Sequence, residues 1–281
     1  MTLSNEDDGQ SVERRARAEL GFYPSYLAAL EPYPEAADLV WRESRRVLHA
    51  TWAPSAARRL ASTAQPAVSR SLPVGATVDR SLSEDETDSL RAVVRFFSFV
   101  VFRLGLSIGA CRYALDGAAT RAAHRRPLPA ETVPLSPCVD AGVETTLPAT
   151  PSLSLVSPEA AGPEVRATFG RVREVLETPN VNTVFRALAS VPAVLEAVLD
   201  MQAEFYETLD ARWAFERSVR GWYATSLDGD SAPRSLRPAL RTEGVERRTV
   251  DEVAGRLRTF HENLPTLVVT VLVADRLLAG P

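Results

Sequence analysis

Apolar residues recur three and four positions apart through both halves of the chain, which is the spacing of one face of a helix. The alternating pattern of a strand is confined to short runs such as 152–156. The longest apolar run, 93–110, contains Arg95 and Arg103, and we interpret it as a buried central helix rather than a membrane span. The pattern therefore predicts an all-α fold with no segment in a membrane.

One helical unit occurs twice in the chain. Near the start of each half the shift is 158 positions (187 − 29): Ala29, Leu30 and Pro34 match Ala187, Leu188 and Pro192. Near the end of each half the shift is 163 positions (251 − 88): Asp88, Arg95, Phe97 and Leu104 match Asp251, Arg258, Phe260 and Leu267. Helix-capping signals precede both later segments, Ser83 with Glu86 and Thr249 with Glu252. These matches predict two homologous helical repeats.

A proline-rich stretch separates the two units. Prolines recur there among Thr, Ser and Ala with little helical periodicity, which is typical of a linker. We therefore divide the chain into a first repeat (1–118), a linker (119–163) and a second repeat (164–281). A long linker lets the second repeat fold back on the first as a pseudo-twofold pseudo-dimer, and a cleft is expected where the two repeats meet.

Charge and cysteine content narrow the range of partners. A net charge of −4 and a pI near 5.6 provide no basic surface for nucleic acid or acidic lipid. The two cysteines, Cys111 and Cys138, form no disulfide framework, and His49 and His124 have no metal-ligand spacing. We expect a cytoplasmic protein with no metal and no organic cofactor, and the sequence is also compatible with a homodimer.

The segment from 179 to 192 reads Pro-Asn-Val-Asn-Thr-Val-Phe-Arg-Ala-Leu-Ala-Ser-Val-Pro and leads into an apolar helical pattern. It resembles the group I 2-haloacid dehalogenases, in which each repeat carries an Arg/Gln-x-Leu-Ala-x-x-Pro segment before a helix. The first half keeps this spacing from Pro34 to Trp41, and the likeness extends to 152–156 and 97–110. It therefore covers most of the chain.

This resemblance implies an all-helical pseudo-dimer that hydrolyses 2-haloalkanoic acids without a cofactor. In that family an aspartate deprotonates a water, which displaces halide from the second carbon directly, and an asparagine orients the water. The aspartate precedes the phenylalanine of the second repeat, where this chain has Val184, and the asparagine falls at Val101. Valine cannot accept a proton, so the resemblance implies a family member whose active site is altered or absent.

Several other residues are candidates for the predicted cleft. Asn180, Asn182 and Thr183 could offer hydrogen bonds there, although Asn and Thr before a helix are also typical capping and turn residues. Arg186 could hold a substrate carboxylate in a bidentate pair, or form an ordinary surface ion pair.

A second group of candidates lies on the helices themselves. Ser98 and His261 occupy equivalent positions of the two repeats (98 + 163 = 261), which makes Ser98 a candidate for substrate binding and His261 the best remaining general base. The run Gly105-Leu106-Ser107-Ile108-Gly109 matches a nucleophile-elbow motif. It lies inside an apolar helical pattern, whereas the motif needs a strand-to-helix turn.

Two functions from different classes remain open. The first is a 2-haloacid dehalogenase-type hydrolase acting on a small carboxylic acid. The second is a non-catalytic protein that keeps the two-repeat scaffold to bind a small ligand or to serve a structural role. A polar, accessible cleft containing Asn182, Thr183, Arg186 or His261 would favour the hydrolase, and a filled apolar interface would favour the second function.

Overall fold

A computed structural model describes residues 10–70, 82–116, 134–144, 154–175, 181–206, 209–226 and 236–279. All regular secondary structure within these ranges is helical, as the hydrophobic pattern predicts. The all-α fold class is therefore confirmed.

The helices of the first half run in a continuous series. They are α1 (Val12–Leu20), α2 (Ser25–Ala28), α3 (Pro34–Leu48), α4 (Ala53–Ser69), α5 (Glu84–Ser98), the π-helical segment η1 (Phe99–Leu104) and α6 (Gly105–Asp116). The rest of the chain forms α8 (Pro137–Glu144), α9 (Pro163–Val175), α10 (Thr183–Leu188), α11 (Pro192–Phe205), α12 (Leu209–Ser226), α13 (Leu236–Thr242) and α14 (Arg247–Ala279).

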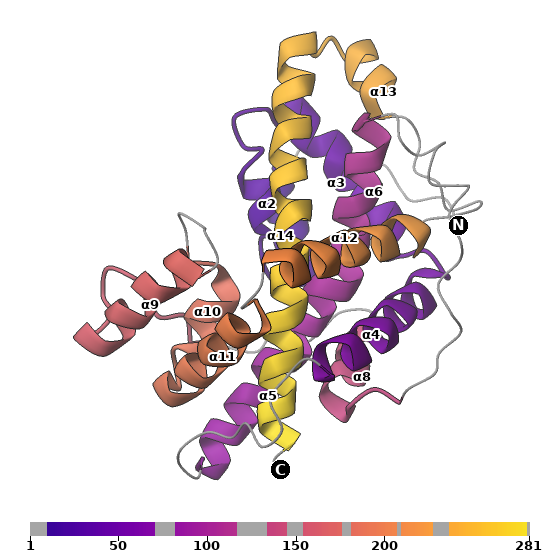
Figure 1. Ribbon diagram of the computed structural model, residues 1–281. Coiled ribbons are helices and arrows are strands. Elements are labelled where there is room, and N and C mark those ends of the chain that lie inside the picture. The colour runs from indigo at the N-terminus through magenta and orange to yellow at the C-terminus, as the bar shows by residue number, and fades with distance from the viewer. Residues whose placement is uncertain are drawn as a thin grey trace.

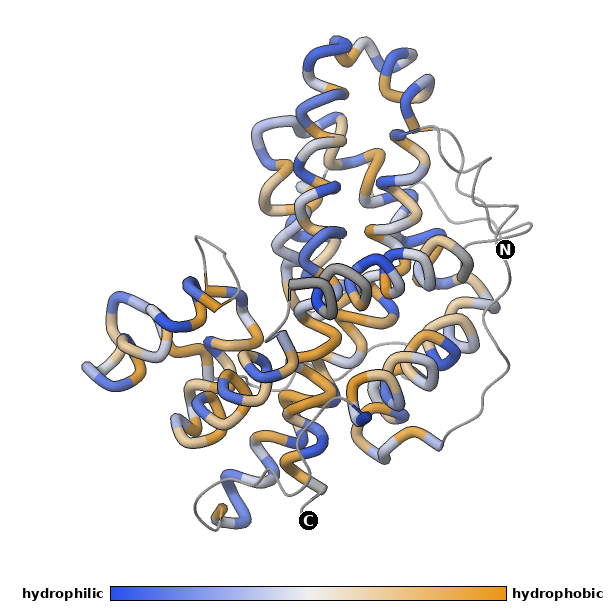
Figure 2. The backbone as a smooth tube through the Cα atoms, viewed as in Figure 1, coloured by the Kyte–Doolittle hydropathy of each residue, from blue (hydrophilic) through white to orange (hydrophobic). Residues whose placement is uncertain are grey.

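Two long helices form the centre of the molecule. Figure 1 shows α14 running beside the continuous helix made of α5, η1 and α6, while α9, α10 and α11 lie together on one side and α4 and α8 on the other. The helix Glu84–Asp116 is long and apolar enough to cross a membrane, but 83% of its most apolar window is buried within the fold. Apolar segments gather along this central pair, and many of the outer segments are polar (Figure 2). The apolar run 93–110 is therefore a core helix.

Three of the predicted helix-start signals are found at helix starts in the structure, and one is not. Pro34 and Pro192 stand in the first turns of α3 and α11, where a missing N–H has no cost. Ser83 and Glu86 form the predicted capping box. Thr249 is not a cap, because α14 begins at Arg247 and Glu252 instead accepts hydrogen bonds from Tyr33 and Arg248.

The segment predicted as a linker contributes to the fold. Residues 137–144 form α8, which packs against α5, and its Gly142 comes so close that an added Cβ would lie 2.5 Å from the backbone oxygen of Arg95. Further along, the backbone N–H of Val156 donates to the oxygen of Arg186 at 3.1 Å. Pro137 stands in the first turn of α8, so a proline that reads as a linker residue is here a helix start.

Candidate functional site

A cavity of about 530 Å³ lies among α2, α5, η1, α6, α10 and α14. Each of these elements contributes part of the wall, together with Arg17 of α1, the chain between α1 and α2, and Leu155 from the segment before α9. The lining residues are Arg17, Phe22, Tyr23, Pro24, Ser25, Tyr26, Phe96, Phe97, Val100, Leu104, Ile108, Leu155, Asn182, Thr183, Val184, Phe260, Asn263, Leu264 and Leu267.

Equivalent positions of the two predicted repeats face this cavity together. At the shift of 158, residues 24–26 pair with 182–184, and all six line the wall. At the shift of 163, the lining residues Phe97, Val100 and Leu104 pair with Phe260, Asn263 and Leu267. The cavity therefore lies where the duplication predicts a cleft.

Aromatic rings form much of the apolar wall. The ring centroids of Phe22 and Phe96 are 5.0 Å apart, and those of Phe96 and Phe97 are 5.1 Å apart, both in edge-to-face contact. This geometry is favoured because the positive edge of one ring meets the negative face of the next. Val184, from α10, is only 2% exposed and adds an aliphatic surface.

Tyr26 presents its ring to the cavity and anchors its hydroxyl elsewhere. The hydroxyl donates to Oγ of Ser44 at 2.9 Å, and Ser44 lies 3.6 Å from the sulfur of Cys111. Burial raises the pKa of Tyr26, so its hydroxyl stays protonated at neutral pH. Burial also raises the pKa of the Cys111 thiol to about 12, which makes it a packing residue rather than a nucleophile.

Three half-buried polar side chains of the wall have hydrogen-bonding capacity to spare. Asn182, Thr183 and Asn263 make no side-chain hydrogen bond within the described parts of the chain. Asn182 is the N-cap residue of α10, yet its side chain makes no capping bond. These groups are therefore available to a molecule in the cavity.

Arg17 is the cationic residue of the lining. Its Nε donates to Glu13 at 2.8 Å, and its guanidinium carbon lies 5.9 Å from the ring centroid of Tyr23. Burial raises the pKa of Tyr23 above its usual value, with the carboxylates of Glu31 and Glu13 adding to the effect. The phenol is therefore neutral near pH 7.

The described lining contains no aspartate, glutamate or histidine. Its ionisable side chains are Arg17, Tyr23 and Tyr26, none of which is a base at neutral pH. No group of three or more His, Cys, Asp or Glu side chains within the described ranges could hold a metal ion. No side chain in the described part of the lining is therefore a general base at neutral pH.

Of the six predicted site residues, two line the cavity, and three lie elsewhere: Arg186, Ser98 and His261. Asn182 and Thr183 line it. Arg186 does not, because its Nε donates to the backbone oxygen of Val156 at 3.2 Å. Ser98 is fully buried where α5 packs against Gly142 of α8. Asn180 lies outside the described residues.

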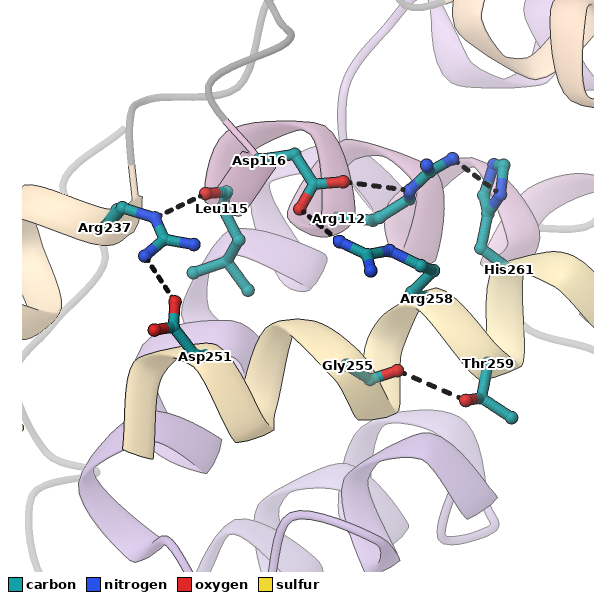
Figure 3. A network of polar contacts seen from close by, with 9 residues as sticks. All are labelled: Arg112, Leu115, Asp116, Arg237, Asp251, Gly255, Arg258, Thr259 and His261. Atoms are coloured by element: carbon teal, nitrogen blue, oxygen red, sulfur yellow. Dashed lines mark hydrogen bonds and ion pairs between the residues drawn. The ribbon is translucent and has the colours of Figure 1, made fainter. Parts of the chain in front are cut away.

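His261, the predicted general base, lies in a separate buried network. Figure 3 shows the imidazole of His261 beside the guanidinium of Arg112. Asp116 accepts a hydrogen bond from Nε of the same guanidinium. Nδ1 of His261 lies 3.3 Å from a terminal nitrogen of Arg112, and the rings of Tyr113 and Tyr223 meet the imidazole edge-to-face. Burial, followed by Arg112 and Arg220, lowers the pKa of His261 to about 3. A base this weak and 0% exposed is a core residue.

Two neighbouring valines of η1, Val100 and Val101, differ in whether they line the cavity. Val101, aligned with the family's water-orienting asparagine, does not line the cavity; Val100 does. The backbone oxygen of Val101 instead accepts a 2.6 Å hydrogen bond from the hydroxyl of Tyr223. Val184, in contrast, lines the cavity.

The Gly-x-Ser-x-Gly run is helical, as its context predicts. Ser107 is buried in α6 and donates to the backbone oxygen of Leu104 at 2.7 Å. Gly105 lies against Tyr223, since an added Cβ would be 2.9 Å from that hydroxyl. Gly105 therefore allows α6 to pack closely against Tyr223 of α12.

Sequence reasoning missed much of the wall, although α14 carries a usable signal. Phe260, Leu264 and Leu267 follow helical spacing, and Asn263 is a polar residue beside that apolar stripe. A polar side chain in such a place points to a cavity. No comparable signal identifies Arg17, because it reads as a surface arginine of a short helix.

Comparison with known proteins gives structural matches only. No family defined by sequence matches the chain, and no curated protein matches it. A D-2-haloacid dehalogenase mutant in complex with D-2-CPA matches with a TM-score of 0.73 at 17% identity, over 98% of this chain and 93% of that one. A D-2-haloacid dehalogenase in complex with L-LA matches over the same shares at the same identity, with a TM-score of 0.74.

Proposed function

The chain has the fold of the D-2-haloacid dehalogenase structures, and from this fold and its cavity we propose that the protein binds a small carboxylic acid without hydrolysing a carbon–halogen bond. A single observation carries the proposal. The described wall of the cavity has hydrogen-bonding groups and a cation, but no aspartate, glutamate or histidine.

Hydrolysis by direct water attack needs a base within hydrogen-bond reach of the water. Val184 stands where the resemblance implies the catalytic aspartate, and its isopropyl group cannot take a proton. Val101, which the alignment sets against the family's water-orienting asparagine, is buried and does not line the cavity, where η1 presents Val100 and Leu104. On this alignment, both positions that the family uses to activate and orient water hold valine, and the described wall has no carboxylate that could take the proton.

Binding needs less than hydrolysis, and the described wall meets the requirements. A mostly apolar cavity with a few polar groups is the usual form of a small-molecule site. Asn182, Thr183 and Asn263 have unused donors and acceptors, and Arg17 provides positive charge. A carboxylic acid with an apolar body satisfies both kinds of surface.

A hydrolytic dehalogenase is the second candidate, favoured by the extent of the structural match to D-2-haloacid dehalogenases.

We also propose that the chain arose by duplication, which the paired cavity positions support, and that it acts in the cytoplasm. The free thiols of Cys111 and Cys138 agree with a reducing compartment.

Halide release from D- and L-2-chloropropanoate separates the two candidates. We expect none from the wild-type protein. Two single variants, Val184→Asp and Thr183→Asp, each place a carboxylate on the cavity wall, and the half-buried Thr183 accommodates it at a smaller desolvation cost than the buried Val184. Circular dichroism and thermal melting confirm that each variant is folded before it is assayed.

Halide release by the wild-type protein at a rate proportional to enzyme concentration would contradict the proposal. Release by a carboxylate variant alone would show that the cavity accepts the substrate and lacks only its base. Calorimetric titration of the wild-type protein with 2-chloropropanoate measures binding independently of turnover, and the absence of binding by any carboxylic acid would overturn the proposed function.

A further inference from the structure

We infer that the preferred ligand of this cavity is an aromatic monocarboxylic acid, with its carboxylate on Arg17 and its ring among the phenylalanines Phe22, Phe96, Phe97 and Phe260. This inference rests on the proposed binding function and specifies its ligand. Three independent features of the described wall support it: volume, aromatic content and the position of charge.

The cavity is too large for a three-carbon acid. Its volume of about 530 Å³ lies well inside the range of roughly 300–1,000 Å³ in which pockets enclose drug-sized molecules. A 2-halopropanoate has only six non-hydrogen atoms and would leave much of the apolar wall in contact with water. A larger apolar body removes that wall from water, at a gain of about 25 cal/mol for each Å².

Aromatic residues concentrate at this cavity. Of the 20 aromatic residues of the chain (4 Trp, 6 Tyr and 10 Phe), six line it: Phe22, Tyr23, Tyr26, Phe96, Phe97 and Phe260. Phe22, Phe96 and Phe97 already form a series of edge-to-face contacts with centroids about 5 Å apart. A ligand ring that joins this series gains the same interaction, which an aliphatic chain of equal area does not.

Positive charge is provided by one residue of the described lining, Arg17. Nε of Arg17 donates to Glu13, which fixes one edge of the guanidinium. The two terminal nitrogens make no hydrogen bond or ion pair within the described residues. Those nitrogens present the paired donors that suit a carboxylate. Glu13 offsets part of the charge, so the pairing adds selectivity for an acid more than large affinity.

Calorimetry with a matched set of ligands and variants tests the inference. The ligands are 2-phenylpropanoate, its neutral amide 2-phenylpropanamide, and 2-chloropropanoate, in which chlorine replaces the ring. The variants are Arg17→Gln, which removes the charge, and Arg17→Lys, which keeps it. The control is Arg14→Gln, because Arg14 is, like Arg17, an exposed arginine of α1, but it does not line the cavity.

We expect the wild-type protein to bind 2-phenylpropanoate more tightly than either of the other two ligands. Arg17→Gln should weaken binding of the acid about three- to fivefold, as expected for an exposed ion pair, and leave binding of the amide unchanged. Arg17→Lys should recover part of the loss, and Arg14→Gln should change neither ligand by more than about twofold.

Two results would overturn the inference while leaving the proposed binding function intact. One is equal affinity of the wild-type protein and Arg17→Gln for 2-phenylpropanoate. The other is preference for 2-chloropropanoate or for a straight-chain acid over the aromatic acid. If no acid in the set binds, the proposed function fails as well.

Discussion

At the residue scale, the imidazole of His261 is fully buried between the rings of Tyr113 and Tyr223, and it does not line the cavity. Arg112 can only donate, so Nδ1 of His261 accepts and Nε2 carries the proton. A second proton would have to enter a site that is 0% exposed and that faces Arg112 and Arg220. The folded protein therefore keeps this imidazole neutral.

This burial predicts a loss of stability in acid. The pKa of His261 is about 3 in the folded protein, against an ordinary value of 6.5. The unfolded state thus binds the proton first as pH falls, so stability is retained above about pH 6.5 and is lost progressively towards pH 3. Between pH 7 and pH 5 the loss from this residue is about 2 kcal/mol in the free energy of unfolding.

Urea denaturation of the wild-type protein and of His261→Asn at both pH values measures that loss. Asparagine keeps an acceptor near Nδ1 and does not titrate, so we expect the variant to lose about 2 kcal/mol less than the wild-type protein does over this interval. Equal losses in the two proteins would show that His261 is not responsible.

Single residues of the site could be predicted from sequence where a motif fixes their place. Asn182, Thr183 and Val184 follow a recognisable segment and do line the cavity. Arg186 lies in the same segment, but a helical turn directs its side chain to the backbone of Val156 instead. Whether a polar side chain faces a cavity or a backbone carbonyl depends on packing between distant segments, which local sequence does not contain.

At the scale of elements, α8 is held against α5 by a close backbone approach. A Cβ on Gly142 would lie 2.5 Å from the backbone oxygen of Arg95 and 2.6 Å from Cβ of Ser98. A backbone oxygen in the middle of a helix cannot move aside without displacing the helix. Glycine is therefore required at this position by packing.

A pair of glycine variants tests this contact. Gly142→Ala should destabilise the protein by about 1–3 kcal/mol, because the added methyl forces α8 away from α5. Gly170→Ala, in α9, meets nothing within 4 Å and should be neutral or stabilise by up to about 1 kcal/mol through helix propensity. Thermal and urea denaturation measure the free energy of unfolding of both variants. An equal change in the two would contradict the close packing of α8 against α5.

Helices with a clear start signal were predictable as elements: α3 and α11 begin with a proline, and α5 begins with a capping box. The π-helical turn of η1 was not, because an apolar run of helical residues has no pattern that marks one extra residue in a turn. Short α8 was missed for a related reason. Eight residues that begin with proline provide too little periodicity to distinguish a helix from a linker.

At the scale of the whole molecule, the cavity joins the two halves of the chain. Segment 24–26 faces segment 182–184, and the continuous helix α5–η1–α6 faces α14 across it. The predicted repeats led us to expect a cleft between the two halves of the chain. The sequence did not reveal which side chains would line it, and only the structure shows that Val184 is one of them.

The most direct test of the central claim, a cavity that binds carboxylic acids and leaves the carbon–halogen bond intact, is a crystal structure of the wild-type protein soaked in 2-bromo-2-phenylacetate, with anomalous data collected at the bromine edge. We predict a bromine peak inside the cavity near Val184 and Phe97, joined by continuous density to the acid. A hydroxy acid without bromine in the cavity would contradict this account, as would bromine bound only elsewhere.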